Sequence, residues 1–90
     1  MSIDKTYVPR KNIVGLQIRE ARKKAKVTQA KLASELQLMG LKIDRSMIAK
    51  IENGARPLSD IEISAIAKIL GISIHLLFDE SSKLLGQLDL

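Results

Sequence analysis

The chain has 90 residues, 46% apolar and 2% aromatic, with a formal net charge of +5, which allows one domain with a modest aliphatic core. It contains no cysteine, which excludes disulfides and thiolate metal sites and is compatible with a reducing cytoplasm. No apolar run approaches the roughly 18 residues of a membrane span, and residues 1–9 contain no signal-peptide segment, so we expect a cytoplasmic protein without a membrane partner.

The first part of the chain divides into an arm and a helix. Residues 1–11 are predicted to form a basic N-terminal arm, because Pro9 disfavours a helix before it and because Arg10 and Lys11 are basic. A first helix is expected over residues 12–25. Its apolar positions recur at helical spacing and form one narrow stripe. These positions are Val14, Ile18, Ala21 and Ala25.

The next four helix starts share one local pattern, a capping residue between an apolar residue before it and another four residues after it. The four caps are Thr28, Asp44, Ser59 and Ser73. Glu62 stands where it would complete a capping box with Ser59. Glycines fall where three of the helices should end, a position that glycine tolerates best. One such match would be weak, but four in succession predict an all-α fold.

The caps delimit helices at about residues 29–39, 45–53, 60–70 and 74–78. The side chains expected to face inward are Leu32, Leu36, Met39, Ile48, Ile51, Ile63, Ile66, Ala67 and Leu70. One helical domain is therefore expected over residues 12–78. Residues 79–90 are expected to be a C-terminal tail, either a dimerisation segment or disordered. Four leucines near the end of the chain give this tail a weak apolar pattern.

Positive charge is concentrated before residue 57. Residues 10–56 carry 12 Lys or Arg against 4 acids, whereas residues 57–90 carry 2 Lys against 5 acids. A basic half joined to an acidic half is typical of a protein with one face for nucleic acid. The alternative from charge alone is an ordinary solvated surface.

Two short motifs mark the second and third predicted helices: Thr28-Gln29 opens the second, and Ile51-Glu52-Asn53-Gly54 closes the third. With these motifs as its most specific matches, the chain resembles the lambda-repressor-like (Cro/Xre type) helix-turn-helix family over about residues 13 to 78. The resemblance implies a compact five-helix domain in which helices two and three form the helix-turn-helix. Residues 37–44 depart from the family because its turn usually has about four residues. We expect this longer, apolar segment to pack down against the domain.

The resemblance also implies roles for individual residues. The residues expected to contact bases are Arg45, Ser46, Met47 and Lys50. Arginine can bond guanine O6 and N7 together, and methionine can touch a thymine methyl group. The residues expected to contact phosphates are Gln29, Asn53, Gly54 and Arg56. Arg22 and Glu52 are expected to form a structural ion pair. The alternative for the base-contacting residues is an ordinary polar helix face. The alternative for Asn53-Gly54 is simple capping of the third helix.

The resemblance favours a sequence-specific regulator that binds double-stranded DNA, a repressor acting as a homodimer on a palindromic operator. Helix five and the tail are the expected dimer surface, through Leu76, Leu77, Phe78, Leu84, Leu85 and Leu88. One alternative is an antitoxin-type protein that binds a toxin protein as well as DNA. A second is a bridging coactivator-type module. We expect no enzyme activity, metal or cofactor, because His75 is the only histidine and the serines lack a Ser–His–acid pattern.

Overall fold

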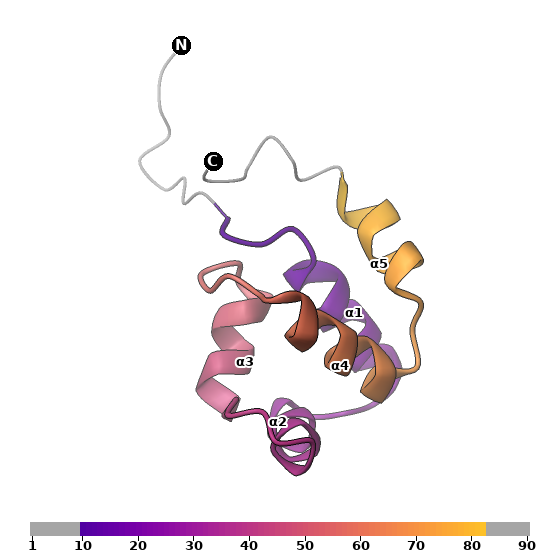
Figure 1. Ribbon diagram of the computed structural model, residues 1–90. Coiled ribbons are helices and arrows are strands. Elements are labelled where there is room, and N and C mark those ends of the chain that lie inside the picture. Colours follow the sequence, from indigo (N-terminus) through magenta and orange to yellow (C-terminus); the bar gives the residue numbers. More distant parts are fainter. Residues whose placement is uncertain (1–9, 83–90) are drawn as a thin grey trace.

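A computed structural model describes residues 10–82, and within them the chain forms five helices and no strand. The helices are α1 (Gly15–Lys24), α2 (Gln29–Leu38), α3 (Arg45–Glu52), α4 (Asp60–Leu70) and α5 (Ile74–Ser81), shown in Figure 1. The predicted all-α fold is therefore confirmed. No single helix in this part of the chain is long and apolar enough to cross a membrane, and α4 with α5 would qualify only as a pair bent by 110°.

The four predicted N-caps are confirmed. Thr28, Asp44, Ser59 and Ser73 each accept a hydrogen bond through the side chain from the backbone N–H three residues later. Ser59 and Glu62 also form the predicted capping box. These bonds satisfy backbone donors that have no partner inside the helix, and they explain why α2 to α5 begin where the sequence places them.

The ends of α1, α2 and α3 fall one residue before their predicted ends, and two other boundaries differ more because side chains continue or replace the helical bonding. α1 begins at Gly15 rather than near residue 12, since the Asn12 side chain accepts the Gly15 N–H at 2.7 Å and stays outside the helix. α5 continues to Ser81, beyond the predicted end at Phe78. The Ser81 hydroxyl donates to the Leu77 carbonyl inside the helix, so the polar run after Phe78 does not break it.

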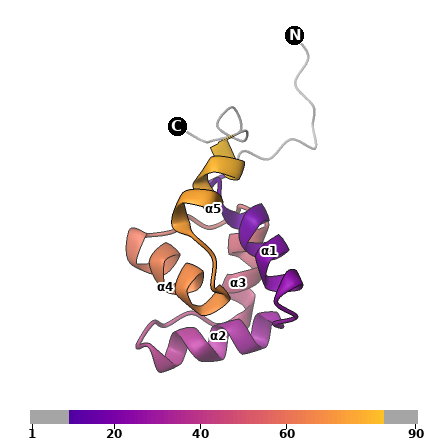
Figure 2. The same ribbon diagram turned by 90° about the vertical axis from the view of Figure 1, so that its right-hand side faces the viewer.

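The core lies between α1, α2, α3 and α4, and α5 packs across α1 and α4, as Figure 2 shows. The largest buried side chains of the core are aliphatic: Val14, Ile18, Leu32, Leu36, Ile43, Ile48, Ile51 and Ile66. Leu77 also belongs to this core, with 3% exposure. Its predicted place on a dimer surface is therefore wrong, because the Ser73 cap turns this position of α5 inward.

The segment between α2 and α3 packs down only in part. Ile43 is buried as expected, but Met39 is 47% exposed, which corrects its predicted inward orientation. The reason is the tight turn at Gly40, whose φ of +89° lets the Leu41 N–H bond the Leu36 carbonyl at 3.0 Å and leaves Met39 outside. Ala25 is likewise exposed, because α1 ends one residue before it.

Candidate nucleic-acid interface

The rotation of α3 about its axis is fixed by two buried side chains. Ile48 and Ile51 are both fully buried against the core. Because residues three apart share one helix face, this burial turns Arg45, Ser46 and Lys50 toward solvent. Met47, half-buried, lies at the edge of the exposed face. The four residues expected to contact bases therefore share the outer side of one short helix.

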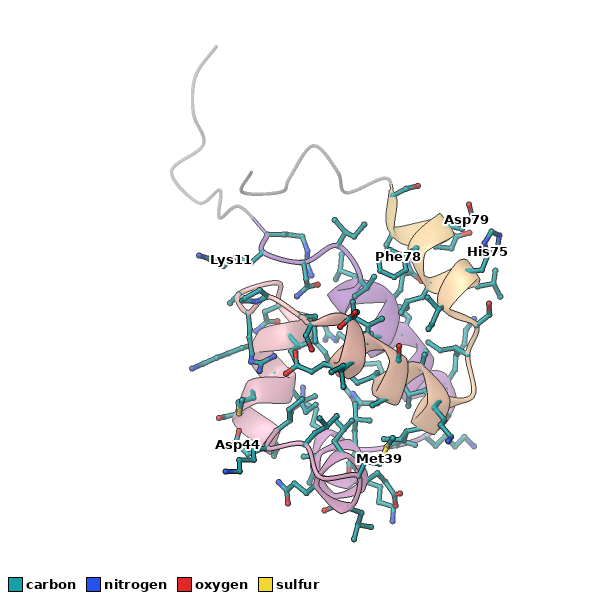
Figure 3. The ribbon with its side chains drawn as sticks, in the orientation of Figure 1. Lys11, Met39, Asp44, His75, Phe78 and Asp79 are labelled. Atoms are coloured by element: carbon teal, nitrogen blue, oxygen red, sulfur yellow. The ribbon has the colours of Figure 1, made fainter. Side chains whose placement is uncertain are left out.

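The N-terminal end of α3 is organised by Asp44. Its carboxylate accepts the Met47 N–H at 2.9 Å and the Ser46 hydroxyl at 2.8 Å. The hydrogen bond from the Met47 backbone is the largest cause that holds the pKa of Asp44 below its usual value, and the Ser46 hydroxyl adds to it. A negative charge thus lies beside Arg45, at the end of α3 that adjoins α2 in Figure 3.

The other end of α3 carries the predicted ion pair. Arg22 Nε lies 2.6 Å and Arg22 Nη2 lies 3.0 Å from the two carboxylate oxygens of Glu52, which is 2% exposed. The hydrogen bond to Glu52 raises the pKa of Arg22. Arg22 also donates to the Val27 carbonyl at 2.9 Å. The pair therefore joins α1, the approach to α2 and the last turn of α3.

Gln29, expected to contact phosphate, also joins this network. Its Nε2 atom donates to Glu52 Oε1 at 3.0 Å. The side chain is half-buried, and it ties the first residue of α2 to the last residue of α3. The carbonyl oxygen of the Gln29 side chain has no hydrogen to offer to a phosphate, so any contact would use its second amide hydrogen or the free backbone N–H groups at the start of α2.

The loop after α3 contains the other three residues expected to contact phosphate. Asn53 is exposed, and Gly54 is buried with a φ of +76°. Arg56 forms a two-pronged pair with Glu62, with distances of 3.1 and 3.0 Å. This bonding is the largest cause that lowers the pKa of the Glu62 carboxyl. The guanidinium of Arg56 is thus already paired, and a phosphate would have to compete with Glu62 or add to the pair.

The segment before α1 braces this loop, which the sequence analysis missed. The guanidinium of Arg10 donates to the carbonyls of Asn12, Glu52 and Asn53 at 3.2, 3.3 and 3.4 Å. The Asn12 side chain donates to the carbonyls of Ile51 and Arg56 at 3.0 and 2.8 Å. The Lys11 N–H donates to the Gly54 carbonyl at 2.7 Å, and Lys11 lies beside the loop in Figure 3. We call residues 10–12 the clamp.

Two glycines make room for the clamp. A Cβ atom on Gly15 would overlap the Ile51 carbonyl oxygen, and one on Gly54 would lie 2.6 Å from the centre of the Arg10 guanidinium. Burial lowers the pKa of Arg10, which bonds helix-end carbonyls here. Cations at a helix C-terminus also interact favourably with the helix dipole. The only feature of the sequence that could have indicated the clamp was the Arg-x-Asn pattern of residues 10–12, shortly before a helix that begins with glycine.

A model of the helix-turn-helix family matches residues 18–77, about two thirds of the chain. The match contains α2 through α4 entire and begins after the clamp. A search of curated proteins found no match. The matched region covers most of the five-helix domain. The chain therefore belongs to the Cro/Xre-type helix-turn-helix family of DNA-binding transcriptional regulators.

Proposed function

We propose that the protein is a sequence-specific repressor that binds double-stranded DNA as a homodimer on a palindromic operator. The observation that carries the proposal is the outer face of α3, where Arg45, Ser46 and Lys50 are exposed while Ile48 and Ile51 are fully buried. An eight-residue helix with polar side chains on its free side fits the major groove, which is wide enough to admit an α-helix.

Base reading would begin at the N-terminal end of α3. Arg45 can donate two parallel hydrogen bonds to O6 and N7 of guanine, and the half-buried Met47 can contact a thymine methyl group. The Ser46 hydroxyl already donates its hydrogen to the Asp44 carboxylate. To contact a base, Ser46 would have to break that bond and donate to the base, or keep it and accept a hydrogen bond from the base through the hydroxyl oxygen. The charge of Asp44 opposes nearby phosphate, which favours a pose in which α3 enters the groove rather than lying on the backbone.

Phosphate contacts would gather beside the C-terminal end of this reading helix. Gln29 at the start of α2 and the loop Asn53, Gly54 and Arg56 after α3 stand at the two ends of the helix-turn-helix unit in sequence, and the bond from Gln29 to Glu52 brings them together in space. Contacts of this kind fix the position of a protein on the duplex without reading its sequence. The tie between Gln29 and Glu52 supports the idea that the two phosphate-binding ends are held at a constant spacing.

Dimerisation follows from the length of the reading helix. Eight residues extend about 12 Å at 1.5 Å per residue, which covers too few base pairs to define one site among many competitors. Two copies related by a two-fold axis would read half-sites about one helical turn apart. A dimer bound across a promoter would repress by excluding the polymerase.

Selection of bound duplexes from a random pool tests this proposal. We expect a palindromic consensus whose half-sites lose one specified base when Arg45→Ala is selected in parallel. Recovery of sequences without symmetry, with one protomer per site, would contradict the dimer. Equal affinity for selected and shuffled duplexes would contradict sequence-specific binding and favour the bridging coactivator-type module.

An antitoxin-type role is the second candidate, and α5 favours it. The exposed side chains of Ile74, Leu76 and Phe78 give this helix an apolar outer side that a protein partner could cover. The leucine-rich tail expected to add to this surface lies outside the described residues, from residue 83 onward. A toxin that co-purifies with the chain in a stable, defined ratio would decide for this role.

A further inference from the structure

The turn after α2 and the outer side of α4 leave an apolar groove open to solvent. The groove has a volume of about 410 Å³, and its lining includes Met39 and Leu41 from the turn and Ile61 and Ser64 from α4. Ile61 is 66% exposed, and Met39 is 47% exposed. Exposed apolar patches of this kind mark interaction surfaces.

The groove side chains differ in how far they belong to the core. Leu41 packs partly against it, whereas Met39 and Ile61 are 47% and 66% exposed. The core beneath is closed, since Leu36, Ile43 and Ile66 are at most 1% exposed. The exposed residues thus face solvent although the fold is already closed beneath them. Their retention at the surface is explained if another molecule covers them.

The charges beside the groove are arranged symmetrically along α4. Asp60, Ser64 and Lys68 follow one another at intervals of four residues, so they form one line on the helix surface. A carboxylate stands at one end of the line, an ammonium group at the other, and a small hydroxyl side chain at the midpoint. Among residues 10–82, neither Asp60 nor Lys68 takes part in an ion pair.

We propose that this groove binds a second copy of the same chain, with the two α4 helices antiparallel about a two-fold axis at Ser64. Asp60 of each copy then faces Lys68 of the other, so the arrangement forms two ion pairs. The small Ser64 side chains let the helix axes approach to about 8–10 Å, and each Ile61 enters the groove of the partner copy. Such a contact is self-complementary, as a two-fold interface requires.

The exposed side of α5 is a poorer surface for self-association. It offers Ile74, Leu76 and Phe78, but α5 itself contains no Lys or Arg. Two α5 helices meeting there could therefore not form a pair of permanently opposite charges like that between Asp60 and Lys68. The line of Asp60, Ser64 and Lys68 on α4 has a negative charge four residues before its midpoint and a positive charge four residues after it. We therefore assign the second copy to α4 rather than to α5.

Binding at this groove leaves the reading helix accessible. In Figure 3, Met39 and Asp44 lie on opposite sides of α2, so the groove and the start of α3 face different directions. The inference rests on the proposed dimer in one respect, because it names the surface of that dimer. It makes its own claim about the protein free of DNA, which can be measured separately.

Charge reversal in the full-length chain tests the antiparallel pairing. Sedimentation equilibrium over a concentration series measures the dissociation constant of the dimer, which should be weak because a small helix stripe buries less than about 1,200 Å². Asp60→Lys alone and Lys68→Asp alone should each raise this constant about tenfold or more, since like charges then meet twice. The double variant with both changes should regain the wild-type constant. Failure of the double variant to regain it would overturn the antiparallel arrangement.

A matched pair of isoleucine variants tests the choice of surface. Ile61→Asp should make the protein monomeric, whereas Ile74→Asp, which places the same charge on an exposed isoleucine of α5, should leave the dimer intact. Thermal unfolding of each variant checks that the fold is retained. Dissociation by Ile74→Asp with no effect of Ile61→Asp would overturn the inference, as would a wild-type protein that stays monomeric at every concentration.

A DNA measurement separates this inference from the proposed function. Ile61→Asp should bind a duplex with one half-site as tightly as the wild-type protein and should lose cooperative binding to two half-sites. If the wild-type protein binds no DNA but self-associates through α4 as described, the proposed function fails and the interface stands. If DNA binds cooperatively and the Ile61 variant keeps that cooperativity, the α4 surface is wrong and the DNA-binding function stands.

Discussion

The N-terminal end of α3 presents exposed side chains around Asp44 and Arg45, whereas the C-terminal end is held by hydrogen bonds from three other segments. Arg22 and Gln29 bond the Glu52 carboxylate there, and the clamp bonds the backbone carbonyls that follow. One helix of eight residues therefore has a free end and a fixed end. The bonds that stabilise the fold go to Glu52 and the carbonyls after it rather than to Arg45, so Arg45 can change with little effect on stability.

The ion pair at the fixed end should give the largest effect. Arg22→Met leaves the Glu52 carboxylate buried and deprived of its main partner, which should lower the free energy of unfolding by about 3–5 kcal/mol. Urea denaturation measures this loss, and Arg19→Met, an exposed cation on the same helix, is the control. Normal stability of the Arg22 variant combined with an altered base preference would contradict the structural role.

The clamp should come next. Arg10→Met removes the donors to the Glu52 and Asn53 carbonyls and should cost about 1–3 kcal/mol of stability, the typical penalty for unsatisfied buried polar groups. Amide hydrogen exchange should also quicken in the loop after α3. Lys11→Met is the matched control, because the Lys11 side chain is exposed and only its backbone N–H joins the clamp. Equal losses for both variants would indicate a general charge effect instead.

At the free end, Arg45→Ala should leave stability unchanged and act only on DNA. We expect a loss of about 1–3 kcal/mol on the selected operator and a relaxed preference at one position per half-site. Fluorescence anisotropy with operator and random duplexes measures both quantities. A loss that is the same on the two duplexes would make Arg45 a phosphate contact.

Arg56 lies at the fixed end but is proposed to touch phosphate, so it tests where the two regions meet. Arg56→Ala should weaken binding to all duplexes alike and reduce the slope of log affinity against log salt by about one unit. Gln29→Ala, which removes no charge, should weaken binding with little change in slope. An unchanged slope for Arg56→Ala would restrict that arginine to its pair with Glu62.

The smallest effect should be the pH dependence contributed by Asp44. Its pKa is lowered in the folded protein, so its contribution to stability is present above the unfolded pKa of about 3.9 and is lost as pH falls through the lower folded value. The free energy of unfolding, measured by denaturation at a series of pH values from neutral to about 2, should therefore fall more with decreasing pH for the wild-type protein than for Asp44→Asn. The Asn side chain still caps the helix but does not titrate. Identical pH profiles would remove Asp44 from the groups that stabilise α3.

Local interactions explain which features could be predicted from the sequence. The caps at Thr28, Asp44, Ser59 and Ser73 bond groups only three residues away, so their pattern is visible along the chain. The clamp joins residues about 40 positions apart and uses backbone carbonyls, which have no signature in the sequence. Arg10 was therefore interpreted as part of a basic arm rather than as a brace.

The same distinction explains the mixed outcome for the candidate site. The Arg22–Glu52 pair was expected from the family resemblance, and the structure contains it. The pairing of Arg56 with Glu62 and of Gln29 with Glu52 was not expected, since the first depends on the path of the loop before α4 and the second on how α2 and α3 approach. Met39 was expected inside from its helical position, but the Gly40 turn ends α2 before that periodicity applies.

The position of the clamp sets how this DNA-reading unit can be transplanted into another protein. A graft that begins at residue 18, where the family match begins, would omit every donor in residues 10–12 and leave the carbonyls after α3 to solvent. A graft that begins at or before residue 10 carries its own brace. Portability of the unit thus depends on three residues that precede its first helix.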